Sequence, residues 1–426
     1  MKRTILLFLL AGLMVAQPSA PDTKQRIRAV RDLSKQGSDG IAGLVPYLSD
    51  PDVEVRVDAV KALVDISGPR TLDPLVTATR DLDSEIEIRA TDGMVNVYLP
   101  GYVKVGLSGS LQRVGNSVRA KFTDTNDQVI DAYLEVKPEV ISALGKLVST
   151  GAGMDVRANA ARAVGILRGR AAIPDLVQGL HSKDDRLMYE SLIAIEKIRD
   201  PSAAPDIAFL LNDLEEKIQV AALETTGILR NKSAAASVRD ALNHARMIKV
   251  RRTALETLAM IADPADHALF LQYLNDRDDG LRAAAAEGLG RLKNPADRTA
   301  MDHAFTDEHK MNARLSMAFA LVALGNLDTG EFGPLRYLIN TLNLSAYKGI
   351  AVAFVTELAR DQNVRQAIYP FLTAATKDEK IQLSIVLSRS GDRDSLPYLE
   401  TLSTDPVPDV ASEGIRSLKT LRARLQ

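Results

Sequence analysis

Residues of the kinds that carry out catalysis form no familiar catalytic motif in this sequence of 426 residues. No HExxH zinc motif, phosphate-binding Walker loop or nucleophile elbow is present. The chain has no cysteine, which excludes disulfides, thiol nucleophiles and Cys-ligated metals. None of the five scattered histidines precedes a glutamate: His181, His244, His267, His303 and His309. We therefore expect no catalytic residues, no cofactor and no metal site.

One segment, residues 101–137, has a pattern suited to binding another molecule. Apolar and polar residues alternate in Ser117–Phe122 and Val129–Val136, and a period of two predicts strands. With Leu111–Val114 they would form a small β-meander that turns at Gly115–Asn116. Arginine and aromatic side chains often anchor protein interfaces, so the partner-binding candidates are taken from this segment: Tyr102, Arg113, Arg119, Lys121 and Phe122. A decorative loop or a degenerate repeat is the alternative.

The same segment contains a partial calcium-loop pattern. Asp124, Asn126, Gln128 and Glu135 stand at places 1, 3, 5 and 12 of such a loop. Val129 stands where the pattern requires glycine, and the flanks have the alternation of strands rather than of helices. The pattern is too incomplete to predict bound calcium.

An apolar position that recurs every 31 or 32 residues organises most of the chain. We call its members the phase residues: Val156, Leu187, Ile218, Val250, Leu281 and Ala313, with Val55 and Ile88 upstream. Small residues four positions on and large apolar residues eleven positions on, such as Leu167, Leu229 and Leu292, complete one helical stripe. A Gly, Asp or Asn thirteen positions on, often followed by proline, ends this first helix and begins a second.

The runs that carry the pattern resemble the short HEAT-like repeats of the phycobilisome-lyase type: Asp50–Leu63, Met154–Leu167 and Asp278–Leu292. The resemblance covers nearly all of the chain beyond the N-terminal segment. It implies an all-α fold, an α-solenoid or superhelix of about a dozen helix-turn-helix repeats, which the β-rich insert at 101–137 interrupts. Some relatives attach bilin pigments to proteins, but a shared repeat supports the fold and not the reaction.

Charged residues recur with the same period. Acidic residues five positions before the phase residue, such as Asp276 and Glu308, accompany arginines one position after it, such as Arg56 and Arg282. In HEAT-like arrays this pattern resembles a ladder of helix caps and ion pairs between stacked repeats. We interpret it as structural and not as a ligand site.

The N-terminal residues have the pattern of a secretory signal peptide. Lys2 and Arg3 precede the apolar run Thr4–Ala16, which is shorter than the roughly 20 residues that cross a membrane. Pro21 disfavours cleavage after Ala20, so we predict cleavage after Ala16. The expected organisation is a signal peptide (1–16), N-terminal repeats (22–100), the insert (101–137) and the remaining repeats (138–426), without a transmembrane segment in the mature chain.

These patterns predict a non-catalytic, protein-binding scaffold of the cell envelope or extracellular space, periplasmic or secreted. The formal net charge of −2 does not favour nucleic acid, and the sequence does not identify the protein partner. We expect the partner on a curved face lined by the second helices, with the insert adding a specific contact. The alternative is an enzyme or lyase-like protein with a site assembled across repeats, which a dense cluster of ionisable groups in a cleft would favour.

Overall fold

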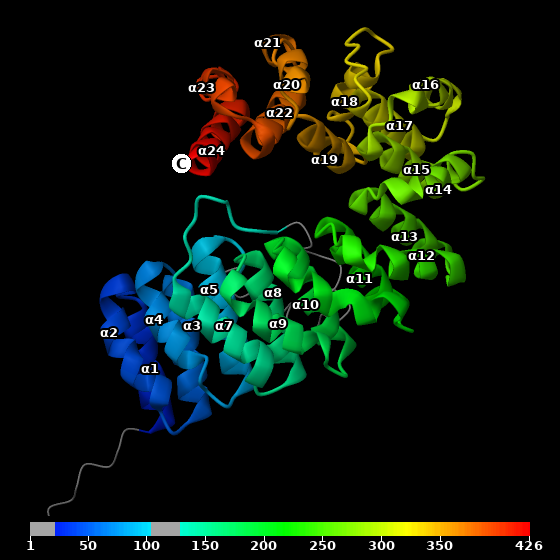
Figure 1. Ribbon diagram of the computed structural model, residues 1–426. Helices are drawn as coiled ribbons and strands as arrows, with labels where there is room; N and C mark the ends of the chain where they lie inside the picture. The colour runs from blue at the N-terminus through cyan, green and yellow to red at the C-terminus, as the bar shows by residue number, and fades with distance from the viewer. Residues whose placement is uncertain (1–21, 104–127) are drawn as a thin grey trace, which may run out of the picture. The chain divides into compact units, whose positions relative to one another are not determined.

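The computed structural model describes residues 22–103 and 128–426, which belong to two compact units, Met1–Met94 and Val95–Gln426 (Figure 1). Every regular element in these described residues is helical, so the fold is an all-α solenoid. None of the described helices is both long and apolar enough to cross a membrane. The elements that begin in the first unit are α1 (Thr23–Ser34), η1 (Gly37–Gly40), α2 (Ile41–Leu44), η2 (Val45–Ser49), α3 (Val53–Ile66), η3 (Pro69–Thr71), α4 (Leu72–Ala78) and α5 (Ser84–Tyr98).

Helices in the second unit alternate between two rows. The first helices, which carry the phase residues or their equivalents, are α8 (Met154–Ile166), α10 (Asp185–Ile198), α11 (Glu216–Ile228), α13 (Ile248–Ile261), α15 (Asp279–Leu292), α17 (Met311–Ala323), α19 (Lys348–Leu358), α22 (Lys377–Ser390) and α24 (Pro408–Leu425). The second helices are α7 (Pro138–Thr150), α9 (Ile173–Leu180), η6 (Pro201–Asn212), α12 (Ala235–His244), α14 (His267–Tyr273), α16 (Arg298–Asp307), α18 (Pro334–Thr341), α20 (Gln362–Ile368), α21 (Phe371–Ala374) and α23 (Leu396–Leu402). Short 3-10 turns lead into several of them: η5 (Arg170–Ala172), η7 (Lys232–Ala234), η8 (Pro264–Asp266), η9 (Pro295–Asp297) and η10 (Arg393–Ser395).

Small residues let the first helices pack directly on one another, and we call these helices of the second unit the first-helix row. The alanines four positions after the phase residue are fully buried, as predicted: Ala59, Ala160, Ala222, Ala254 and Ala285. A Cβ added to Gly290 of α15 would lie 2.7 Å from the Cα of Ala320 in α17, and one added to Gly165 equally close to Ala194. Backbones this close make the first-helix row the tighter side of the stack. In Figure 1, α12, α14 and α16 accordingly lie outside α13, α15 and α17.

We expect Gly290→Ala to destabilise the protein by about 1–3 kcal/mol, because the added methyl group must push α17 away from α15. This cost exceeds the gain of about 1 kcal/mol that alanine brings to a helix interior. Gly349→Ala in α19 is the matched control, since a Cβ there meets nothing within 4 Å, and it should stabilise by about 0.5 kcal/mol. Urea unfolding of both variants tests the packing; equal shifts in the same direction would contradict it.

The turn between the two helices lies one residue earlier than the sequence pattern predicts. The left-handed residue is twelve positions after the phase residue, with φ of 52° at Arg168, 57° at Arg199, 51° at Arg230 and 54° at Lys293. The next residue is extended at Asp200, Asn231, Asp263 and Asn294, and three of these cap the 3-10 helix or turn that follows, as Asp263 does by accepting the Ala265 N–H at 3.0 Å. The Asp and Asn side chains at this position therefore cap the element that follows, and the left-handed conformation belongs to the residue before them.

Two predictions about the apolar stripe and the second helices are only partly confirmed. Leu167 and Leu229 are buried, at 2% and 7% exposure, but Leu292 is half-buried and Leu289 is the fully buried leucine of its helix. The second helix at Pro201–Asn212 is a 3-10 helix that contains Pro205. Proline lacks the N–H that an α-helix requires at that position, which explains the difference.

The predicted strand Val129–Val136 is wrong. This described part of the insert is irregular chain with a turn at Ala132–Tyr133, so no β-rich insert is supported here. The buried Ile130 donates its N–H to the Ile166 carbonyl at 3.0 Å, which satisfies the end of α8 instead of a neighbouring strand. The other predicted strands, Leu111–Val114 and Ser117–Phe122, lie outside the described residues.

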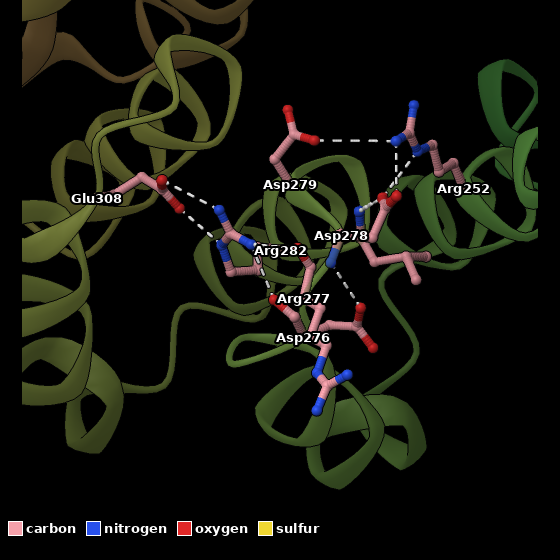
Figure 2. A network of polar contacts seen from close by, with 8 residues as sticks. Arg252, Asp276, Arg277, Asp278, Asp279, Arg282 and Glu308 are labelled. Atoms are coloured by element: carbon pink, nitrogen blue, oxygen red, sulfur yellow. Dashed lines mark hydrogen bonds and ion pairs between the residues drawn. The ribbon is translucent and has the colours of Figure 1, made fainter.

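The predicted ladder of ion pairs is confirmed at one pair of this region, Arg282 with Glu308, and the pair before it uses other residues than predicted (Figure 2). Arg282 donates to Glu308 of the next repeat at 2.7 and 3.1 Å and to the Asp276 carbonyl at 2.8 Å. One repeat earlier, Arg252 rather than the predicted Arg251 binds Asp278 at 2.7 and 2.6 Å. Asp278 also accepts the Leu281 N–H at the start of α15. These arginines therefore join consecutive repeats, and their guanidinium groups are engaged by acceptors within the protein.

Candidate functional site

Of the partner-binding residues predicted from sequence, Tyr102 alone lies among the described residues. It is half-buried just after α5, where the Asn96 side chain accepts the N–H groups of Gly101 at 3.2 Å and Val103 at 3.0 Å. Arg113, Arg119, Lys121 and Phe122 lie outside the described residues. The structure therefore leaves the insert untested as a binding element and directs attention to the repeats.

Basic side chains recur at the ends of the first helices in the second unit. We call Arg168, Arg199, Arg230 and Lys293 the basic ladder, because they occupy the same left-handed position in their repeats and all are exposed. A cation at a helix C-terminus is favoured by the helix dipole, which explains the residue type. The recurring tripeptide of Leu or Ile, then Arg or Lys, then Gly, Asp or Asn was the sequence signal for this ladder, and the sequence analysis missed it.

A cavity of about 240 Å³ opens beside the ladder, between the ends of α13, α15, α17 and α19. Small residues, Ala262, Gly290 and Ala323, leave the space, and apolar residues such as Phe319 and Leu358 line it. Nearly all of the lining belongs to first helices or to the turns that follow them. The expectation that the second helices form the binding face is therefore not supported by the position of this cavity.

The base of the cavity is a buried ion-pair network centred on Arg291. Its side chain, 7% exposed, donates to Glu357 at 2.9 and 3.1 Å and to Glu287 at 2.9 Å, and it lies over the Phe319 ring. Burial would raise the pKa of Glu357, but the hydrogen bond and charge of Arg291, helped by Arg230, hold it below its usual value. Arg291 is thus committed to structure.

The rim of the cavity carries two cations that form no ion pair in the described part of the chain, although the charge of Arg360 reaches Glu357 and lowers its pKa. Neither Lys293 nor Arg360 forms a side-chain hydrogen bond or ion pair within the described residues, and both are exposed. The lining as a whole has four cationic and two anionic side chains, a net charge of +2: Arg230, Arg291, Lys293, Arg360, Glu357 and Asp361. An apolar hollow with excess positive charge is suited to an apolar group that carries or adjoins a carboxylate.

The positive charge continues along the ladder toward α8. The side chain of Arg168 is exposed but partly desolvated by its neighbours, which lowers its pKa, and the nearby Arg199 and Arg389 lower it further. Asp131 opposes this shift, but Arg416 already donates to Asp131 at 2.9 Å. The guanidinium groups of Arg168 and Arg199 form no hydrogen bond or ion pair in the described part of the chain. They remain available to an external anion.

A row of glutamates lies six positions after the phase residues of three successive repeats, at Glu224, Glu256 and Glu287. Burial, with the charges of Glu287 and Glu224, raises the pKa of Glu256 to about 7. Burial also raises the pKa of Glu224. A carboxyl group that titrates near neutrality is able to act as a general acid or base. This row of glutamates therefore favours the alternative of an enzyme with a site assembled across repeats.

We expect Glu256→Gln to stabilise the protein at pH 8 by roughly 1–3 kcal/mol and to have no effect near pH 4. The folded-state pKa of Glu256 is about 7, against a usual value of 4.5. The folded protein therefore holds this proton more tightly, and stability falls as the pH rises from 4.5 through 7. The exposed Glu215→Gln serves as the control. Unfolding curves at several pH values test this, and a constant difference between Glu256→Gln and wild type would contradict it.

Two family profiles match the sequence, HEAT repeats over residues 11–94 and 244–322 and the phycobilisome (PBS) lyase HEAT-like repeat over residues 156–182. This chain is a HEAT-repeat protein. The resemblance inferred from the repeats is thereby confirmed. A comparison with curated proteins gives no match.

Among the described residues, no group of three or more acidic or histidine side chains is placed to hold a metal ion.

Solved structures similar to this HEAT-repeat protein are distant in sequence and in structure. The phycocyanin lyase complex of CpcE and CpcF from Nostoc is 18% identical with a TM-score of 0.35, over 59% of this chain and 94% of that chain. An engineered protein is 17% identical with a TM-score of 0.37, over 93% and 98% of the two chains. Human deoxyhypusine hydroxylase in complex with glycerol is 15% identical with a TM-score of 0.27, over 68% and 98%. Likenesses of this degree carry no argument about function.

Proposed function

We propose that this HEAT-repeat protein is a non-catalytic scaffold that binds a protein partner on the first-helix row of its second unit. The observation that carries the proposal is the unpaired positive charge at Lys293 and Arg360 around an apolar cavity. Structural arginines of the repeats, such as Arg282, bind carboxylates directly, whereas neither of these two cations forms a side-chain hydrogen bond or ion pair among the described residues. Unpaired charge beside apolar surface is typical of a protein–protein interface whose partner carries the opposite charge.

The partner is acidic where it meets this surface, because positive and negative patches across an interface attract and select one another. The basic ladder extends the positive charge over several repeats, so the contact is long rather than confined to the cavity. Binding should weaken as salt is added, since exposed charges are screened beyond about 10 Å at 0.1 M.

The test is affinity capture by the full-length protein with quantitative mass spectrometry. Lys293→Gln with Arg360→Gln removes the two unpaired cations, and Lys183→Gln with Arg277→Gln removes two exposed cations that do not line the cavity. A partner lost from the first double variant and retained by the second, with unchanged melting of both, supports the proposal. Equal recovery from both variants contradicts it.

An enzyme with a site assembled across repeats is the second candidate, and the row Glu224, Glu256 and Glu287 favours it. Its cavity-side member, Glu287, is bound by Arg291 and by the Ser316 hydroxyl at 3.0 Å, which leaves Glu256 as the residue able to exchange a proton. A turnover that Glu256→Gln abolishes, without loss of partner binding, would support this candidate over the scaffold.

We also propose that the chain is exported after cleavage behind Ala16, as its basic start and short apolar run indicate. The mature protein would then begin at Gln17 and lie in the periplasm or outside the cell. Intact-mass measurement of protein from the cell envelope tests this, and retention of Met1 would contradict it.

A further inference from the structure

The basic ladder has one missing member, and the gap coincides with the cavity. Arg168, Arg199 and Arg230 follow in three consecutive repeats, the next repeat has Ala262 in the same left-handed position, and Lys293 follows. Ala262 is one of the small residues that leave space in the cavity. Read along the row, the surface therefore presents three cations, an apolar hollow and a further cation. Of the three, Arg230 also binds Glu357 at 3.0 Å, whereas Arg168 and Arg199 have no ion pair among the described residues.

The spacing of this row matches an extended polypeptide. Packed helices lie about 8–10 Å apart, so equivalent residues of neighbouring repeats have roughly this separation. An extended chain in the polyproline II conformation advances about 3.1 Å per residue with three residues per turn, so side chains three positions apart lie on one face and about 9 Å apart. Side chains at every third position of such a segment can therefore meet successive members of the ladder.

The hollow fits one apolar side chain. Its volume is about 240 Å³, and Phe319, Val322, Leu358 and Val364 supply apolar walls. Lys293 and Arg360 at its rim would pair with carboxylates beside the buried side chain. The ordering of an extended segment costs conformational entropy, which several charge contacts and one buried anchor would offset.

We infer that the first-helix row binds an extended acidic segment of the partner protein. The segment has side chains at every third position in the order acidic, acidic, acidic, apolar, acidic, in either chain direction, and the apolar side chain occupies the cavity. This inference rests on the proposed function and adds the chemistry and spacing of the partner.

Fluorescence anisotropy of the full-length protein with labelled, terminally blocked peptides tests the inference. The matching peptides carry four glutamates and one leucine at every third position in this order or its reverse, with serine and glycine between them. We expect at least one of them to bind about tenfold more tightly than a peptide of the same composition with contiguous glutamates. Replacing its leucine by serine, or using the Lys293→Gln/Arg360→Gln protein, should each weaken binding by about tenfold. The Lys183→Gln/Arg277→Gln protein should bind like wild type.

Equal affinity for the matching and contiguous peptides would overturn the inference, as would equal affinity of the two double variants. Affinity that increases only when the peptide has a free C-terminal carboxylate would assign the cavity to a chain terminus instead. Tighter binding of oligothymidine than of either matching peptide would replace the acidic segment by nucleic acid. If the peptides fail while the cavity still determines capture of a partner, the inference fails alone and the proposed function stands.

Discussion

Replacing Arg291 by methionine should lower the free energy of unfolding by about 3–5 kcal/mol at neutral pH. The substitution removes the cation between Glu287 and Glu357, which leaves Glu287 without an ion pair and Glu357 with Arg230 alone. The penalty should shrink as the pH falls below 4.5, because protonation then neutralises Glu357, whose pKa in the folded wild type is held below that value. Denaturant unfolding across this pH range measures both effects.

The exposed Arg277 provides the control for this prediction. Its side chain forms no hydrogen bond or ion pair among the described residues and points away from the ladder of ion pairs in Figure 2. Arg277→Met should change the stability by less than about 0.5 kcal/mol. Glu357→Gln added to Arg291→Met should recover part of the loss, since it removes a carboxylate that Arg291 no longer neutralises and that Arg230 alone accompanies. A loss at Arg291 as small as at Arg277 would show that the buried network does not form.

Leu289→Ala should cost about 2–5 kcal/mol, because Leu289 is fully buried between neighbouring helices and its removal leaves a cavity in the core. Leu292→Ala, in the same helix and at the predicted stripe position, should cost about 1 kcal/mol, because Leu292 is half-buried. Thermal and urea unfolding of the two variants test the order of the effects. A larger loss at Leu292 than at Leu289 would contradict the packing of α15.

The repeat could be predicted from the sequence because every unit must bury the same face against the next. Ala254 and Ala285 stand at equivalent places and both have zero exposure, so one alignment of phase residues locates the tight helix contacts throughout. The predicted position of the turn is one residue too late, because Gly, Asp or Asn was expected to adopt the left-handed conformation. In four described turns a cation adopts it instead, as at Arg199 and Lys293.

The cavity could not be predicted in the same way, because it arises where the residues of a few repeats differ from the residues at the equivalent positions of the other repeats. Its lining runs from Arg230 to Val364 and includes an alanine in place of a ladder cation. Alternation in Val129–Val136 was a misleading signal, because Ile130 is buried against the end of α8 and not on a sheet. A short alternating stretch does not by itself specify a strand, and among residues 22–103 and 128–426 no strand pairs with this one.

Site-specific photocrosslinking tests most directly the claim that a partner lies on the first-helix row. A benzophenone amino acid at Ala323, which lines the cavity, reports on this row, and one at the exposed Leu271 of α14 reports on the second helices. We expect crosslinks from Ala323 to an acidic segment of one partner, reduced by the Lys293→Gln/Arg360→Gln substitutions, and none from Leu271. Crosslinks to that partner from Leu271 and not from Ala323 would place the binding face on the second helices and contradict the proposed function.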